Sequence, residues 1–193
     1  IWAGTAAMVR NDGLRTNEQA FWQKFAAIYG EERARADQPL FEDFYANEFN
    51  TARDTCGFNP AAAETVHKLQ ARGYRVALAT NPIFPHIATE HRIRWAGLTP
   101  GDFELYTTYE RSTFCKPNVD YYREVARTLG VRPEQCLMVG NDAAEDMAAR
   151  ALGMDVFLLT DCLINAKSID LSSFPQGDFA ALNAYLDRLN TEA

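Results

Sequence analysis

The sequence lacks a long hydrophobic run, a basic cluster and any closely spaced pair of cysteines. No apolar run approaches the roughly 18 to 20 residues that a membrane-spanning helix needs. The formal net charge is -7 at pH 7, and the acidic and basic residues are interspersed. Because a protein that binds nucleic acid usually carries a basic patch, we expect a soluble protein with neither nucleic acid nor membrane as a partner.

The spacing of the cysteines excludes a zinc knuckle and a closely spaced redox motif. Cys56, Cys115, Cys136 and Cys162 are too far apart in the sequence for the spacing of a zinc knuckle or a redox motif. The first residues also lack the charged region and apolar segment of a secretory signal. We therefore predict free thiols and a cytoplasmic protein. The first residue is Ile1 rather than Met, which indicates a fragment or a processed product.

The first fifty or so residues predict helices with aromatic side chains on one face. The residues at helical spacing are Phe21, Phe25 and Ile28 in one segment, and Phe41, Phe44, Tyr45 and Phe49 in the next. Thr16 with Gln19 resembles a capping box, and Gly30 resembles a helix stop. We expect the aromatic positions to form core packing, and we assign residues 1–57 to a helical domain.

After Gly57 the pattern alternates between helical segments and short β-rich runs. The expected strands cover residues 75–80, 103–109, 136–140 and 155–160, the last of the chain. The expected helices begin at Pro60 and then cover residues 85–96, 119–129, 144–152 and 178–189. This alternation predicts an α/β domain over residues 58–193, with a parallel sheet and helices on both faces.

Polar residues stand where such a sheet would bind a ligand, beyond the carboxyl ends of its strands. Thr80 and Asn81 end one expected strand, and Lys116 lies in the loop before a helix. Asp142 ends another strand, and Asp146 follows one helical turn later. Two carboxylates at one strand end favour a bound cation, and Mg²⁺ takes carboxylate and phosphate oxygens. Together with a lysine and a hydroxyl, they predict a site for phosphoryl transfer.

Each of these residues also has an ordinary structural explanation. Thr80 and Asn81 are suited to cap a turn, and Asp142 is suited to cap a helix. Asp146 fits a solvated surface position, and a lone lysine such as Lys116 is usually a solvated charge. The combination, in order and at the ends of predicted strands, favours the functional interpretation.

Three segments resemble signature motifs of the haloacid-dehalogenase-like hydrolases, in the branch of the capped phosphatases. Leu78-Ala79-Thr80-Asn81 is similar to motif II, Lys116-Pro117 to motif III, and the segment from Gly140 to Asp146 to the acidic motif IV. The resemblance implies a Rossmann-like three-layer α/β core over residues 58–193. It also implies that residues 1–57 are the helical cap.

The resemblance also implies roles for the site residues. Thr80 would hydrogen-bond the transferring phosphoryl group, with Asn81 beside it at the substrate, and Lys116 would neutralise the nucleophile and the phosphate. Asp142 would ligate Mg²⁺, and Asp146 would orient a metal-bound water or Lys116. Because Asn141 departs from the family's commonest Gly-Asp form, the acid that touches the metal directly stays open.

Motif I of the family is the one signature that the sequence does not match. It carries a nucleophilic aspartate and, two residues later, an acid/base aspartate after the first strand, whereas no two aspartates here are two apart. The nearest imitation, Val9-Arg10-Asn11-Asp12-Gly13, has arginine in the nucleophile's place and predicts a turn between helices. We expect the first core strand to be missing from this chain.

The leading hypothesis is Mg²⁺-dependent hydrolysis of a small phosphate monoester through an aspartyl-phosphate intermediate in the intact protein. A catalytically inactive binding module is the alternative from another class, and a phosphomutase or dehalogenase is the alternative within the superfamily. A dehalogenase needs no metal, so the pair Asp142 and Asp146 counts against it. Candidates to face the substrate from the cap are Trp2, Arg10, Arg15, Trp22 and Arg53. The substrate and the oligomeric state stay open.

Overall fold

The computed structural model describes residues 1–189, and the chain divides into two compact units. Unit 1 is Ile1–Cys115 and unit 2 is Lys116–Ala193. This division follows contacts along the chain and differs from the cap and core predicted above, whose boundary after residue 57 stays a prediction.

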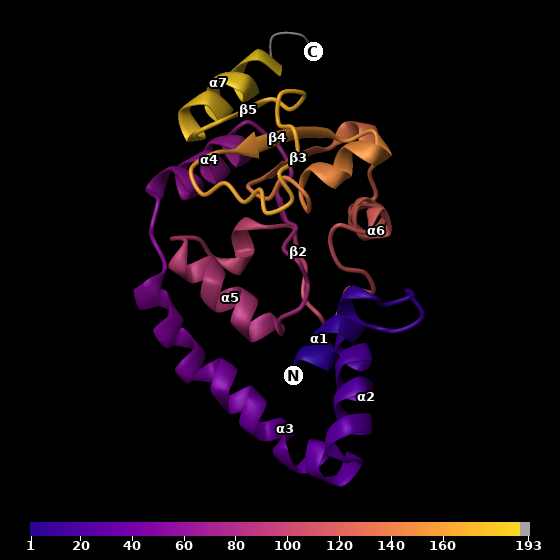
Figure 1. Cartoon of the computed structure of the whole chain (residues 1–193). Coiled ribbons are helices and arrows are strands. Elements are labelled where there is room, and N and C mark those ends of the chain that lie inside the picture. Colours follow the sequence, from indigo (N-terminus) through magenta and orange to yellow (C-terminus); the bar gives the residue numbers. More distant parts are fainter. Residues whose placement is uncertain (190–193) are drawn as a thin grey trace. The chain divides into compact units, whose positions relative to one another are not determined.

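Unit 1 begins with four helical segments (Figure 1). They are α1 (Trp2–Val9), α2 (Asn17–Tyr29), α3 (Glu31–Ala46) and the 3₁₀ segment η1 (Glu48–Thr55). The capping box is confirmed, because Thr16 Oγ1 accepts from the backbone N–H of Gln19 while the Gln19 side chain accepts from that of Thr16. The predicted turn between α1 and α2 is also confirmed.

An aromatic cluster packs these helices together. Phe21 is buried, and its ring contacts the rings of Trp22, Phe25 and Phe41. The expectation of core packing is wrong at two positions, because Ile28 is 66% exposed and Phe44 is 46% exposed. Phe44 still contacts the rings of Tyr45 and Phe49, whereas Ile28 follows the cluster by one helical turn.

The rest of unit 1 is a small α/β arrangement. It contains α4 (Pro60–Ala71), β1 (Ala77–Leu78), α5 (His86–Trp95), the 3₁₀ turn η2 (Pro100–Asp102) and β2 (Leu105–Tyr106). β1 pairs in parallel with β2, with Ala77 opposite Leu105 and Leu78 opposite Tyr106. The prediction of a buried strand over 75–80 is wrong in length and burial. Within residues 1–189 β1 has a single paired neighbour, so its other edge is uncovered by a strand.

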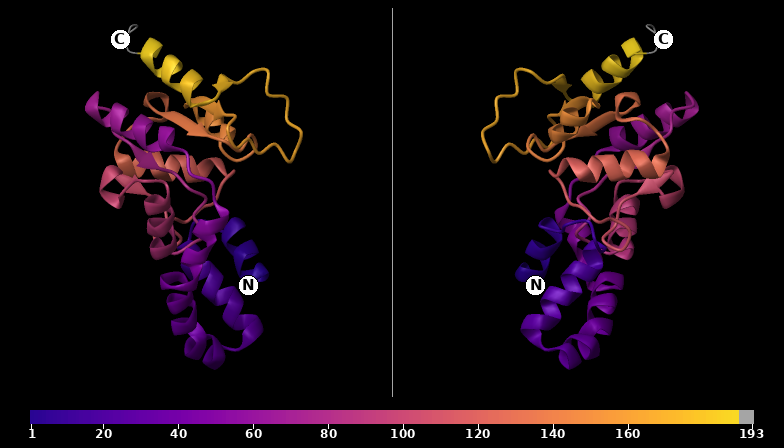
Figure 2. Two further views of the ribbon diagram at one scale, coloured as in Figure 1. Left: turned by 90° about the vertical axis from the view of Figure 1, so that its left-hand side faces the viewer. Right: turned by 90° about the vertical axis from the view of Figure 1, so that its right-hand side faces the viewer.

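Unit 2 contains a parallel sheet in the order β3-β4-β5 (Figure 1). Its elements are α6 (Val119–Leu129), the 3₁₀ turn η3 (Pro133–Gln135), β3 (Leu137–Gly140), the 3₁₀ segment η4 (Met147–Leu152), β4 (Asp155–Leu159), β5 (Gln176–Gly177) and α7 (Phe179–Leu189). The long loop between β4 and β5 leaves the sheet of this unit (Figure 2). Because β3 and β4 run in parallel, their carboxyl ends lie at the same edge of the sheet.

The sequence predicted most of unit 2 correctly. The helices expected over 119–129 and 178–189 are confirmed as α6 and α7, which bury Tyr122 and Ala126, and Leu182 and Leu186, respectively. Two predictions are wrong. The helix expected over 144–152 is a 3₁₀ segment that begins at Met147, because the residues before it form a turn capped by a side chain. β5 was missed because it is only two residues long.

The four cysteines are free, as predicted. Within residues 1–189 no helix combines the length and the apolar character that a membrane crossing requires.

Candidate functional site

A buried ion pair joins Lys116 to Asp146 at the carboxyl end of β3. Lys116 Nζ lies 2.6 Å from Asp146 Oδ1, and each residue is 6% exposed. Two opposite charges at this distance and burial compensate each other's loss of hydration, so removing either one would leave the other uncompensated. Lys116 is therefore not the solvated lysine of the ordinary structural explanation, and Asp146 is not a surface acid.

The second carboxylate oxygen of Asp146 holds the loop that follows β3. Asp146 Oδ2 accepts a hydrogen bond from the backbone N–H of Asp142 over 2.9 Å. The close approach depends on Gly140, the last residue of β3, since a Cβ at that position would lie 2.1 Å from Asp146 Oδ2. No side chain fits there without moving the carboxylate, so glycine at 140 is a requirement of the ion pair.

The two carboxylate oxygens of Asp142 differ in their hydrogen bonds. Its Oδ1 accepts hydrogen bonds from the backbone N–H groups of Ala144 at 2.8 Å and Glu145 at 2.9 Å. The structural explanation anticipated a helix cap, whereas these bonds cap a turn that precedes η4. Its Oδ2 has no hydrogen-bond donor among residues 1–189, so a carboxylate oxygen is left for another ligand.

Two buried tyrosines of α6 enclose the ion pair. Lys116 Nζ lies 5.8 Å from the centre of the Tyr121 ring, and Tyr121 has no exposed surface. The Tyr122 hydroxyl donates a hydrogen bond to the backbone carbonyl of Glu145. Burial, and next the negative charge of Asp146, raise the pKa of Tyr122, so the phenol keeps its proton and stays a donor.

The segment 162–164 is hydrogen-bonded to the loop that follows β3. The backbone N–H of Ala143 donates to the Ile164 carbonyl at 2.9 Å, and that of Ile164 donates to the Asn141 carbonyl at 2.8 Å. Asn141 Nδ2 donates to the Cys162 carbonyl at 2.6 Å. Asn141, the residue that departs from the family's commonest pattern, therefore has a structural partner, and Asp142 stays at the strand end.

In unit 1 the corresponding strand end carries hydroxyl groups in place of charges. Thr80 Oγ1 donates to the Thr107 backbone carbonyl at 3.1 Å, and Thr107 Oγ1 donates to the Thr80 carbonyl at 2.9 Å. Thr107 is 4% exposed and Thr80 is half-buried. Reciprocal bonds of this kind fix the backbone directly after β1 and β2.

Asn81 follows in a tight turn, where its backbone carbonyl accepts from the N–H of Ile83 at 2.9 Å. The turn that was expected as the ordinary explanation of Thr80 and Asn81 is therefore present. The structure brings Lys116, Asp142 and Asp146 together within unit 2, and it places Thr80 and Asn81 at the end of β1 within unit 1.

The donor set at the end of β3 fits a hard divalent cation. Among the described residues no group of three or more His, Cys, Asp or Glu side chains is arranged to hold a metal. Mg²⁺, however, is usually bound by one or two carboxylates together with water and substrate phosphate. Both oxygens of Asp146 are engaged by Lys116 and by the backbone, so Asp142 Oδ2 is the oxygen with capacity for a cation.

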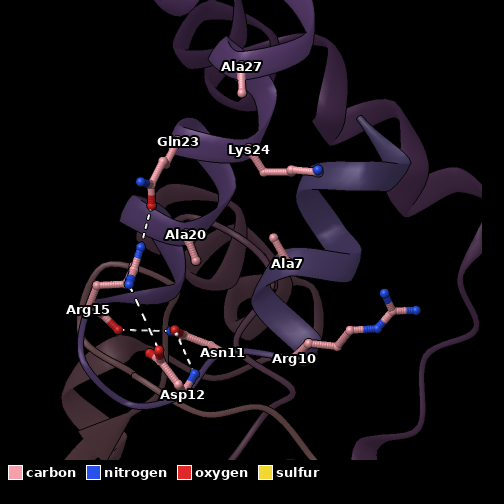
Figure 3. A pocket seen from close by; sticks show the side chains of 9 residues that line it. All are labelled: Ala7, Arg10, Asn11, Asp12, Arg15, Ala20, Gln23, Lys24 and Ala27. Carbon is pink, nitrogen blue, oxygen red and sulfur yellow. Dashed lines mark hydrogen bonds and ion pairs between the residues drawn. The ribbon is translucent and has the colours of Figure 1, made fainter.

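A separate cavity of about 370 Å³ lies between α1 and α2 (Figure 3). Its basic side chains are Arg10, Arg15 and Lys24. Arg15 donates to the Gln23 side chain on one side, whereas Arg10 and Lys24 extend to the other side (Figure 3). The three cations do not converge on one point. Two of the cap candidates for facing the substrate, Arg10 and Arg15, line this cavity, whereas the residues of the three motif segments do not.

The model of one protein family matches most of the chain. The family is described as the haloacid dehalogenase-like hydrolases, and the match covers residues 4–153. The chain belongs to the haloacid dehalogenase-like hydrolases. The matched segment includes every predicted site residue and most of the helices assigned to the cap.

Two relatives illustrate the range of similar proteins. A phosphoglycolate phosphatase of Escherichia coli K12 is 28% identical over 166 residues, which are 84% of this chain and 62% of that protein. A glyceraldehyde 3-phosphate phosphatase of Methanothermobacter thermautotrophicus is 30% identical over 109 residues, which are 56% of this chain and 47% of that protein. The chain thus spans less than two thirds of the length of these relatives.

Solved structures support the fold. A crystal structure of an L-2-haloacid dehalogenase aligns with a TM-score of 0.62 and 19% identity, over 97% of this chain and 80% of that one. At this identity the likeness shows the fold alone. The chain has the α/β fold of this family, a Rossmann-like core with a helical cap.

Sequence reasoning missed Gly140, Tyr121 and Tyr122 as parts of this site. Gly140 was taken as a strand end and as the first residue of the segment that resembles motif IV, although a glycine before an acidic loop is also a signal for close backbone approach. Tyr121 and Tyr122 were predicted only as part of the helix over 119–129, and nothing in their spacing indicates which charged group they enclose.

Proposed function

We propose that the intact protein hydrolyses a small phosphate monoester with the help of Mg²⁺. The observation that carries the proposal is the buried pair of Lys116 and Asp146 beside Asp142, whose Oδ2 has no donor among residues 1–189. Membership of the haloacid dehalogenase-like hydrolases and the phosphatase names of similar proteins support it. The capping of a turn explains the hydrogen bonds of Asp142 Oδ1. It does not explain why a lysine is buried beside two acids.

In this proposal Asp142 Oδ2 holds Mg²⁺, which supplies positive charge to the phosphate oxygens. Lys116 Nζ carries a further positive charge and donates N–H groups to the phosphate and to the attacking carboxylate. Asp146 positions Lys116 through their ion pair and compensates its positive charge. The Thr80 hydroxyl and Asn81 bind the phosphoryl oxygens.

The reaction runs in two steps that divide the barrier. An aspartate carboxylate attacks phosphorus, the P–O bond to the substrate alcohol breaks, and the acid/base aspartate of the family's motif I donates the proton with which the alcohol leaves. Water then cleaves the aspartyl phosphate to inorganic phosphate and restores the carboxylate. The printed sequence has no aspartate pair with the family's spacing, so the nucleophile belongs to the proposal for the intact protein.

The test is hydrolysis of p-nitrophenyl phosphate by the purified intact protein, with and without a chelator. We expect activity that needs Mg²⁺ and falls by about 100-fold or more in Asp142→Asn. Asp155→Asn is the matched control, because this exposed acid starts β4, opposite Leu137 and away from the carboxyl end of β3. Equal activity in Asp142→Asn and Asp155→Asn would contradict the proposed role of Asp142.

A second substrate, a 2-haloacid, separates the alternatives. A dehalogenase would release halide from a 2-haloacid without added metal, and an inactive binding module would show neither reaction.

The proposal also places the protein in a reducing cytoplasm, because its four cysteines are free.

A further inference from the structure

One buried amide in unit 1 is bonded to two chain segments that lie next to the proposed phosphate-binding residues. Asn17, the first residue of α2, has no exposed surface. Its Nδ2 lies 3.1 Å from the Pro82 carbonyl oxygen, 3.2 Å from the Phe114 carbonyl oxygen and 3.3 Å from Cys115 Sγ. Pro82 directly follows Thr80-Asn81 in the sequence, and Cys115 directly precedes Lys116.

The rest of the Asn17 side chain and its backbone are also engaged. Asn17 Oδ1 accepts from Asn11 Nδ2 at 2.9 Å, so the direction of the amide is fixed and its NH₂ faces the carbonyls. The Asn17 backbone N–H donates to the Ser112 carbonyl at 2.9 Å, and that of Glu18 donates to the Tyr109 carbonyl at 2.9 Å. The start of α2 is therefore attached to the segment that leads to Lys116.

Helix formation does not explain the choice of asparagine at this position. Thr16 already caps α2, with Gln19 completing the capping box. Asparagine is a weak helix former, and a buried amide is tolerated only when its hydrogen bonds are made. Its acceptors lie 65, 97 and 98 residues away in the sequence, so the side chain acts on tertiary structure.

We propose that Asn17 is a positioning residue for the phosphate site. The Asn17 clamp, formed by Asn17 with Pro82, Phe114 and Cys115, holds the backbone that follows Thr80-Asn81 and the backbone from which Lys116 departs. Both are held by a single amide on α2, a helix of the predicted cap. The role in catalysis rests on the proposed function, whereas the clamp itself rests on the hydrogen bonds alone.

Asn17→Asp tests the clamp with almost no change of shape. At pH 7.5 a carboxylate would face two carbonyl oxygens and a sulfur atom with no hydrogen to donate. We expect hydrogen exchange in peptides that cover residues 80–85 and 112–116 to become about 10-fold faster or more, and alkylation of the buried Cys115 to accelerate similarly. Exchange across the rest of α2 stays slow because the Thr16 cap remains.

Kinetics and pH separate positioning from simple loss of structure. We expect kcat for p-nitrophenyl phosphate to fall roughly 10- to 100-fold with KM changed less, because misplaced groups weaken the transition state. Toward pH 5 the aspartic acid of Asn17→Asp regains a proton that it can donate to one carbonyl. Relative to the wild type at the same pH, part of the kcat and of the slow exchange should return.

Asn59→Asp is the matched control for this change of an amide to a carboxylate. Asn59 is exposed in unit 1, and its Oδ1 caps α4 by accepting from Ala61 N, which an aspartate also does. We expect wild-type exchange, alkylation and kcat. If Asn17→Asp does not fold, Asn17→Ser, which keeps one donor in a smaller side chain, is measured in the same way and should show the same changes to a lesser degree.

The results have distinct meanings. If the faster hydrogen exchange is confined to residues 17–29, the Asn17 clamp is wrong, and Asn17 stabilises only α2. Loosened loops with unchanged kcat would overturn the positioning role. If the wild-type protein hydrolyses no phosphate ester, the proposed function fails, and exchange and Cys115 alkylation alone decide whether the Asn17 clamp exists.

Discussion

The two strand ends that carry the predicted motifs are built from different interactions. At the end of β3, opposite charges are buried together, with Lys116 Nζ 2.6 Å from Asp146 Oδ1. At the end of β1, Thr80 and Thr107 exchange neutral hydrogen bonds between hydroxyls and backbone carbonyls. Similar positions after parallel strands thus present charge in one unit and neutral donors in the other.

The difference indicates which of the two strand ends is more sensitive to substitution. A buried charge is tolerated only while its partner is present, so the β3 end tolerates few substitutions. A neutral hydrogen bond contributes about 1 kcal/mol to the free energy of unfolding, so the β1 end should tolerate more. The following variants test this contrast, from the largest expected effect to the smallest.

Lys116→Met should have the largest effect. It leaves Asp146 buried and uncompensated, and we expect the free energy of unfolding, measured with urea, to fall by about 3–5 kcal/mol. Phosphatase activity should fall about 100- to 1,000-fold. In Lys116→Met/Asp146→Asn the buried charge is gone, so most of the stability should return while the activity does not. A double variant no more stable than Lys116→Met would contradict the ion-pair account.

Gly140→Ala should come next. The added methyl group would lie 2.1 Å from Asp146 Oδ2 and displace that carboxylate. We expect a loss of about 1–3 kcal/mol in the free energy of unfolding and a roughly 10- to 100-fold loss of kcat. Gly57→Ala is the control, because no atom lies within 4 Å of a Cβ there. Equal effects of the two substitutions would argue against a special role for Gly140.

Thr80→Val tests the neutral strand end. It removes the hydrogen bonds to Thr107, and we expect a loss of about 1 kcal/mol in the free energy of unfolding and a roughly 10-fold loss of kcat. Thr128→Val is the control, since this exposed hydroxyl bonds only the Glu124 carbonyl on α6 among residues 1–189. A larger loss of stability than in Lys116→Met would reverse the contrast.

Glu18→Gln should have the smallest effect, and its sign depends on pH. Burial, and next the charges of Glu110 and Glu42, raise the pKa of Glu18 above its usual 4.5. The folded state therefore favours the neutral acid, and ionised Glu18 lowers stability above pH 4.5. We expect Glu18→Gln to raise Tm at pH 7 but to leave it unchanged well below pH 4.5. A lower Tm at pH 7 would show that the carboxylate is stabilising.

Local patterns predicted the elements, but they did not predict long-range contacts. The four-residue spacing of Asp142 and Asp146 correctly predicted two acids near one strand end, and the backbone N–H of Asp142 does bond Asp146. The partner of Asp146 is Lys116, 30 residues earlier in the sequence, and no periodicity relates them. Asn17 was likewise only a helix residue in the sequence, because its acceptors lie on segments that become neighbours after folding.

The end of α2 and the turn before η4 show the same limit. The aromatic spacing predicted a continuous stripe, yet Ile28 is exposed because burial depends on where the neighbouring surface ends. A helix was expected from Ala144, but Asp142 Oδ1 accepts from the N–H groups of a turn, and the helical segment begins only at Met147. A side-chain cap of this kind is compatible with a turn or a helix, so periodicity alone did not distinguish the two.

The most direct test of the account is calorimetric titration of the purified protein with Mg²⁺. We expect binding in the wild type and in Asp155→Asn, and at least a 10-fold weaker affinity in Asp142→Asn, because Asp142 Oδ2 is the carboxylate oxygen left open at the end of β3. Unchanged Mg²⁺ affinity in Asp142→Asn would contradict the claim that this strand end is the metal and phosphate site.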